Sequence, residues 1–149
     1  MHTTQVSHTT AVSDHQHRLI ARSAAVVGLL GIALIHLLDL QGKLHETPYL
    51  GVAYIGLIAA TIATAAALVR RDDRRAWTAA TALALLTIVG YAVNRTIGMP
   101  AATGDIGNWL EPLGLASLFV ESITAVVSIY GLTESARPMV TGGLGIRAA

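Results

Sequence analysis

The 149-residue sequence contains no cysteine, and only 13% of its residues are charged. The absence of cysteine excludes disulfide bonds, thiolate metal sites, iron–sulfur clusters and thiol redox chemistry. Soluble domains are roughly 25% charged, so the low charge content argues against a soluble domain. The formal net charge of +1 gives no electrostatic basis for binding nucleic acid. Signatures of known enzyme classes are also absent, which leaves an enzymatic activity without positive support.

Long apolar runs are what the sequence does contain. Four of them cover residues 19–40, 49–69, 76–97 and 110–132. Each is about 20 residues long, the length that an α-helix needs to cross the hydrocarbon core of a bilayer. The connecting segments are short, so consecutive helices should be antiparallel neighbours. The sequence therefore predicts an all-α fold, an integral membrane four-helix bundle with up-down topology, in the plasma membrane.

The basic residues predict how the bundle is oriented. Only Lys43 and Arg95 flank one side of the spans, whereas eight arginines flank the other: Arg18, Arg22, Arg70, Arg71, Arg74, Arg75, Arg137 and Arg147. Cytoplasmic segments carry an excess of Lys and Arg, so both termini are expected in the cytoplasm. Residues 1–18 then form a disordered His- and Thr-rich cytoplasmic tail, residues 19–133 the transmembrane domain, and residues 134–149 a second cytoplasmic tail.

Polar side chains interrupt the runs in the outer half of the bundle. Glu121 lies at the centre of the fourth run, in a stripe that recurs at helical spacing: Ser117, Glu121, Thr124 and Ser128. Such a stripe should face the other helices, because contact with lipid would be unfavourable. Helical side chains lean towards the N-terminus of their helix, which brings Arg95 and Glu121 towards each other. Arg95 is therefore the predicted counter-ion of Glu121, directly or through the Tyr91 hydroxyl or a water.

Ionisable residues inside a membrane are by default functional candidates. We predict an outward-facing cluster that binds a small ligand or a proton, formed by His36, Tyr91, Arg95, Glu111 and Glu121. Imidazole and carboxylate groups also suit a divalent metal, for which the candidate ligands are His36, His45, Glu46, Glu111 and Glu121. None of these residues has a diagnostic metal-site spacing. The alternative interpretation is a protonated Glu121 that serves only as a hydrogen-bonding link between helices.

Other roles stay open at the level of sequence. A haem is unfavoured, because only His36 lies within a span and paired histidines are the usual ligands. Proton-coupled transport through Glu121 would require a dimer of such small bundles. A third role is that of an accessory subunit, or a homo-oligomer, docking through small residues of the second span: Gly56, Ala59 and Ala63.

The segment 99–112 is predicted to fold back as a lid over the mouth of the cluster. Pro112 suits an early helical position, where its missing N–H does no harm. Asp105 or Asn108 could satisfy the free backbone amides at that helix end.

The stretches "HETPYLGVAYI", "VGYAVNRTIGMP" and "GNWLEPLGLASLFVE" resemble a group of small four-span integral membrane proteins of actinobacteria. The resemblance covers roughly residues 30–125 and implies the fold and the lineage, with no activity. The positions that carry it are Glu46, Pro48, Arg95, Pro100, Glu111, Pro112 and Glu121.

Reporter fusions test the predicted orientation. Fusions at residue 73 and at the C-terminus should report the cytoplasm, and a fusion at residue 104 should report the outside, because the arginines are retained on the inner side. An external signal at residue 73 would reverse the predicted orientation.

Overall fold

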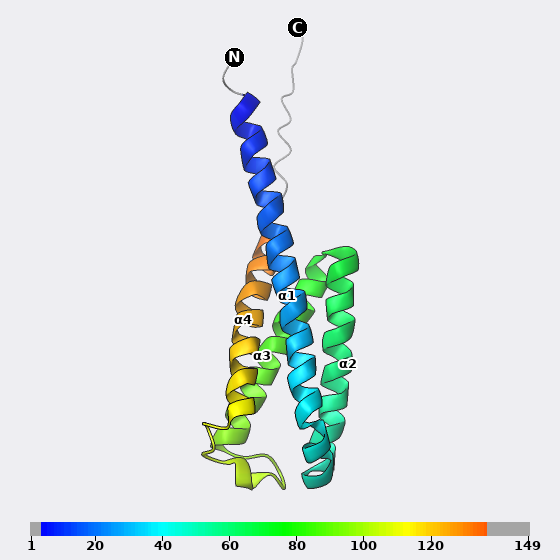
Figure 1. Cartoon of the computed structure of the whole chain (residues 1–149), viewed down its shortest axis with the longest axis vertical. Coiled ribbons are helices and arrows are strands. Elements are labelled where there is room, and N and C mark those ends of the chain that lie inside the picture. The colour runs from blue at the N-terminus through cyan, green and yellow to red at the C-terminus, as the bar shows by residue number, and fades with distance from the viewer. Residues whose placement is uncertain (1–3, 137–149) are drawn as a thin grey trace.

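The computed structural model describes residues 4–136, and the side chains of residues 15–136. It contains four α-helices and a single turn of 3-10 helix: α1 (Thr4–Glu46), α2 (Pro48–Arg71), α3 (Arg74–Thr96), η1 (Thr103–Asp105) and α4 (Pro112–Ser135) (Figure 1). All four α-helices are long and apolar enough to cross a membrane. The prediction of an all-helical chain with four potential spans is confirmed.

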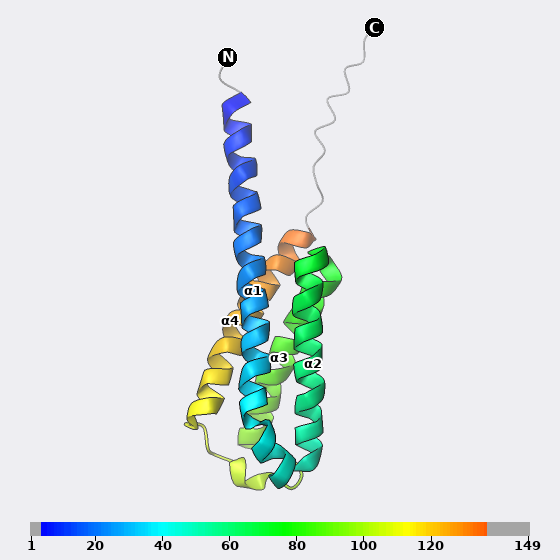
Figure 2. The same ribbon diagram turned by 45° about the vertical axis from the view of Figure 1, so that its right-hand side comes forward.

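The two ends of the bundle differ in how the helices are joined. At the turn end, a short turn at Asp72 and Asp73 links α2 to α3; at the loop end, Thr47 links α1 to α2 and residues 97–111 link α3 to α4. Helices that follow one another in the chain run in opposite directions (Figure 1). Helix α3 starts beside α2 at the turn end and diverges from it towards α4, as Figures 1 and 2 both show.

The first helix begins and ends outside the predicted span. Helix α1 starts at Thr4, so the described part of the predicted N-terminal tail is continuous with the helix. Arg137, Arg147 and most of the predicted C-terminal tail lie outside the described residues.

The connection between α1 and α2 is much shorter than residues 41–48, which separate the first two predicted spans. Only Thr47 separates the two helices, and it is buried. The residue before a proline is disfavoured in the helical conformation, so Pro48 forces the chain to turn at Thr47. Gly51 allows the close approach, because a Cβ there would lie only 2.5 Å from Leu44 Cδ2.

The turn end is held by polar contacts. Asp72 adopts a left-handed conformation with φ of 40°, which Asp tolerates better than most residues. Its Oδ1 accepts a hydrogen bond from Trp77 Nε1 at 2.8 Å, and its Oδ2 lies 3.5 Å from Arg18. Asp73 caps α3 by accepting a hydrogen bond from the backbone amide of Ala76. The turn therefore fixes α1, α2 and α3 relative to one another.

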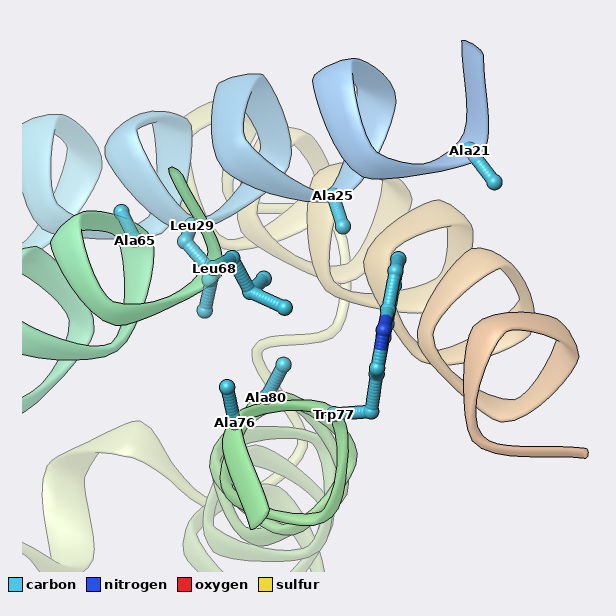
Figure 3. Close-up of a cluster of buried hydrophobic side chains, with 8 residues drawn as sticks. All are labelled: Ala21, Ala25, Leu29, Ala65, Leu68, Ala76, Trp77 and Ala80. Carbon is cyan, nitrogen blue, oxygen red and sulfur yellow. The ribbon is translucent and has the colours of Figure 1, made fainter. Parts of the chain in front are cut away.

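Small side chains form the core near the turn end (Figure 3). The cluster consists of Ala21, Ala25, Leu29, Ala65, Leu68, Ala76, Trp77 and Ala80. Alanines let helix backbones approach closely, which is how helices associate where lipid removes the usual hydrophobic driving force. The Trp77 ring lies beside α4, where Gly131 leaves room for it (Figure 3). Close packing at this end contrasts with the more open loop end.

We expect Gly131→Leu to lower the apparent melting temperature in detergent. Its side chain would collide with the Trp77 ring, which is held by its bond to Asp72, and overpacking of this kind costs about 1–3 kcal/mol. Gly56→Leu on α2 is the matched control, because a Cβ at Gly56 meets no atom within 4 Å. Equal melting temperatures for the two variants would contradict the packing of Trp77 against α4.

Candidate functional site

A cavity of about 240 Å³ lies between the helices in the loop-end half of the bundle. All four α-helices line it, and the loop 97–111 adds Met99, Asp105 and Glu111. The five residues predicted to form a ligand-binding cluster all line this cavity: His36, Tyr91, Arg95, Glu111 and Glu121. The tertiary structure thus brings together side chains from α1, α3, α4 and the N-terminal boundary of α4.

The polar stripe of α4 faces the other helices, as predicted. Its four members, Ser117, Glu121, Thr124 and Ser128, are all buried. Thr124 contacts α1 at Gly28, where a Cβ would overlap the threonine hydroxyl. Only Ser117 and Glu121 reach the cavity, because the other two lie nearer to the tightly packed turn end.

Glu121 forms the floor of the cavity and is 1% exposed. Its Oε1 accepts a hydrogen bond of 2.6 Å from Ser117, one turn earlier in the same helix. Its Oε2 has no hydrogen-bond partner among the described residues. Buried polar atoms in proteins are almost always paired, so an unpaired carboxyl oxygen in a residue that lines a cavity requires an explanation.

His36 and Thr87 lie on either side of Glu121, close enough to interact with it. The His36 ring is hydrogen bonded through Nδ1 to the Ile32 carbonyl at 2.9 Å, so Nδ1 carries the hydrogen. In a neutral ring this leaves Nε2 as a free acceptor. The Thr87 hydroxyl donates to carbonyls of its own helix. The floor therefore offers mainly hydrogen-bond acceptors.

Arg95 is buried at the mouth of the cavity, where it pairs with two carboxylates. Its Nη1 lies 3.0 Å from Asp105 Oδ1, and its Nη2 is bonded to Glu111 Oε2. Its guanidinium also lies 5.0 Å from the centre of the Tyr91 ring. These contacts join the end of α3 to the loop and to the start of α4.

The predicted pairing of Arg95 with Glu121 is therefore wrong. Glu111 precedes Glu121 by ten residues, about 15 Å along a helix, and it lies at the level where α3 ends. The loop places Glu111 and Asp105 beside the guanidinium of Arg95, so Arg95 is paired at the mouth and not with Glu121 at the floor. The Tyr91 hydroxyl does not bridge to Glu121 either, since it donates to the Trp109 carbonyl at 3.1 Å.

Asp105 anchors the loop over the mouth. It accepts a hydrogen bond of 2.9 Å from Asn94 and lies 3.3 Å from Lys43 Nζ. Partial burial would raise the pKa of Asp105, but the bond from Asn94 and the charges of Lys43 and Arg95 outweigh it and hold this pKa below its ordinary value. The expectation that Asp105 or Asn108 caps α4 is not met, because Glu111 is the N-cap residue and no side chain caps this helix end.

The loop also contacts α2 and α3 through aromatic side chains. The Tyr49 hydroxyl donates to the Pro100 carbonyl at 2.7 Å, and the Tyr91 ring makes an edge contact with Trp109. Helix α4 begins at Pro112, so the proline occupies an early helical position, as predicted. The prediction that this segment folds back over the cluster is confirmed.

The predicted metal-ligand set is not brought together. His45 and Glu46 are exposed near the end of α1 and do not line the cavity, because the helix continues past the predicted loop boundary and keeps them on its surface. Within residues 15–136, no three His, Asp or Glu side chains are placed to hold a metal ion.

Four ionisable lining residues were not among the sequence candidates: Asp39, Lys43, Tyr54 and Asp105. The Tyr54 hydroxyl donates to Asp39 Oδ2 at 3.4 Å, and its ring makes an edge contact with His36. Asp39 lies one turn beyond His36 on α1, a spacing that indicates the same face. Nothing local in the sequence indicates that Asp105 would meet Lys43, because that contact depends on the path of the loop.

No protein-family model matches the chain, and neither a curated protein nor a solved structure matches it. The resemblance to four-span actinobacterial proteins therefore stays a prediction.

Double-mutant cycles test the assignment of the ion pairs. Arg95→Gln leaves Glu111 without its partner and removes one of several partners of Asp105, so it should lower the stability of the protein by about 1.5–3 kcal/mol, and Glu111→Gln should cost less. Melting temperatures in detergent should show a coupling between these two substitutions of about 0.5–3 kcal/mol. Arg95→Gln and Glu121→Gln share no partner, so their effects should add; strong coupling between them would contradict the geometry described above.

Proposed function

We propose that this chain is an integral membrane protein that binds a small molecule in the cavity between its helices. The observation that carries the proposal is the unpaired Oε2 of Glu121, a buried residue that lines the cavity. A buried carboxyl costs free energy unless its oxygens are paired, so a ligand that donates a hydrogen bond there would remove an existing penalty.

A purely structural role for Glu121 fits the geometry less well. A carboxyl that links helices should be bonded across a helix interface, whereas the bond to Glu121 Oε1 comes from Ser117 in the same helix. His36 on α1 and Thr87 on α3 lie close enough to interact with Glu121, but among the described residues Oε2 has no hydrogen-bond partner on either helix. Binding explains the unpaired oxygen, because a site for a polar ligand must keep a hydrogen-bonding group unpaired until the ligand arrives.

The distribution of charge supports access from outside the cytoplasm. Arg18, Arg22 and the four arginines that flank Asp72 and Asp73 lie at the turn end, and among residues 4–136 the loop end carries only Lys43 and Arg95 as Lys or Arg. By the positive-inside rule the turn end is cytoplasmic, and the cavity mouth at the loop end then opens to the outer side of the plasma membrane.

A second candidate, an accessory subunit of a membrane complex, has one observation in its favour. Gly56, Ala59 and Ala63 are exposed on α2, and a Cβ at Gly56 would meet no atom within 4 Å. Another helix could approach closely there. Co-purification of a second membrane protein that is lost in Gly56→Leu would favour this role.

Thermal shifts with a fragment panel test the proposed function. The panel should contain water-soluble amines, alcohols, amides and carboxylic acids, and at least one class should raise the melting temperature of the wild-type protein in detergent. Thr87→Phe should abolish the shift, because it fills the cavity from α3.

Leu85→Phe is the matched control, since Leu85 lies on α3 but is exposed and does not line the cavity. It should keep the wild-type shift. A panel without any shift, or shifts that persist in Thr87→Phe, would refute binding in the cavity.

A further inference from the structure

We propose that the ligand of this cavity is a small organic cation, an ammonium group on an apolar body. The inference rests on the proposed function and adds the chemical class of the ligand. Its basis is an imbalance of charge in the cavity lining, together with the apolar surface between the two charged regions.

The lining holds two basic side chains, Lys43 and Arg95, and four acidic ones: Asp39, Asp105, Glu111 and Glu121. Counting only Asp, Glu, Lys and Arg side chains, the lining has a formal charge of −2 when every acid is ionised and −1 when Glu121 is protonated, the form that its burial favours. An enclosed site of one sign concentrates counter-ions, and this one favours a cation over an anion.

Neither basic side chain is free to balance the remaining acids. Arg95 is engaged by Asp105 and Glu111, and Lys43 lies 3.3 Å from Asp105 and 3.6 Å from Glu46. These contacts occupy both cations at the mouth. Within the described side chains, Asp39 and Glu121 have no direct ion pair with Lys or Arg, and of the two only Asp39 feels the charge of nearby Lys43.

Asp39 and Glu121 lie on opposite sides of His36. Asp39 is one turn beyond His36 on α1, and Glu121 is its neighbour across the helix interface on α4. Among the described side chains, the one hydrogen bond to the Asp39 carboxylate is the long one from Tyr54, at 3.4 Å. An ammonium group beside either carboxylate would donate hydrogen bonds to it and neutralise its charge, and the two together define a strip of negative potential along the cavity.

The rest of the lining requires an apolar body. Ile35, Leu50, Leu57, Leu86 and Leu113 all contribute to the wall. Helices α2 and α3 diverge towards the loop end (Figure 2), and a Cβ at Gly90 would meet no atom within 4 Å. Leu86 is 65% exposed although it lines the cavity. The cavity wall is therefore thin towards the bilayer, which suits a ligand whose apolar part tolerates hydrocarbon.

A bare metal ion fits the same charge less well. Metal binding needs several oxygen or nitrogen ligands converging on one point, and within residues 15–136 no three His, Asp or Glu side chains do so. An ammonium group needs only a few acceptors, because its apolar substituents contact the wall.

The test compares 1-adamantylamine with 1-adamantanol, which differ only in an ammonium or a hydroxyl head. The amine is protonated at pH 7.5, as alkylamines generally are. We expect calorimetric titration of the purified protein in detergent, corrected with protein-free micelles, to give at least about tenfold tighter binding of the amine, equivalent to 1.4 kcal/mol.

Glu121→Gln and Asp39→Asn should each reduce that preference several-fold. Glu46→Gln is the control, because Glu46 is an acid at the same end of the bundle that does not line the cavity, and it should keep the preference. If Glu121→Gln fails to fold, as judged by size-exclusion chromatography, Asp39→Asn carries the test, since Asp39 is only half-buried.

The outcomes separate the ligand class from the proposed function. Equal binding of amine and alcohol, both lost in Thr87→Phe, would overturn the cation and leave the cavity as a binding site. An amine preference that survives in Glu121→Gln and Asp39→Asn would also overturn it. If only neutral or acidic fragments of the panel raise the melting temperature, the cation is overturned as well. The absence of binding by every compound would refute the proposed function itself.

Discussion

The ion pairs of Arg95 are the interaction on which the loop end depends. One guanidinium joins the last turn of α3, the carboxylate of Asp105 in the loop and that of Glu111 at the start of α4. Arg95 is 5% exposed, so its charge requires these partners. Lys43 extends the network to α1 through Asp105. The cavity is bounded at its mouth by these same residues, and its shape follows from where the network holds the loop.

The helices are closely packed near the turn end of the bundle and more widely separated near the loop end. Near the turn end, alanines and Gly131 let the helices approach around Trp77, and space is filled by one large ring. Towards the loop end α2 and α3 diverge (Figure 1), and a cavity of about 240 Å³ remains between the helices. The buried ionisable side chains His36, Arg95 and Glu121 all lie in this half. Ionisable side chains are costly to bury, and at the loop end Arg95 has ion-pair partners whereas Glu121 Oε2 has no partner among the described residues.

The polar residues divide into two functional groups on this basis. Arg95, Asp105, Glu111, Lys43 and Asn94 pair with one another and hold the loop end together, although Asn94 Oδ1 and Arg95 Nε have no hydrogen-bond partner among the described residues. Glu121, His36 and Asp39 have fewer partners and face the cavity. The first group explains how a loop can close the bundle without an apolar lid. The second group is where a ligand would gain most, because its hydrogen bonds would replace none that already exist.

The sequence by itself determined the number of α-helices, the approximate limits of α2, α3 and α4, and the burial of the α4 stripe. These properties depend on local quantities: the length of an apolar run, the 3.6-residue period and the effect of Pro112 and Pro48 on the backbone. It also indicated five residues of the cavity lining, because depth in a membrane can be counted along a helix.

Only the tertiary structure decided which of these residues meet. Arg95 pairs with Glu111 instead of Glu121 because the loop 97–111 carries two carboxylates to the end of α3, and the path of a loop is not encoded in helical periodicity. The exclusion of His45 and Glu46 follows from one residue, Thr47, where the chain turns. The cavity itself depends on the divergence of α2 and α3. This divergence results from the contacts among all the helices, so no single segment of the sequence predicts it.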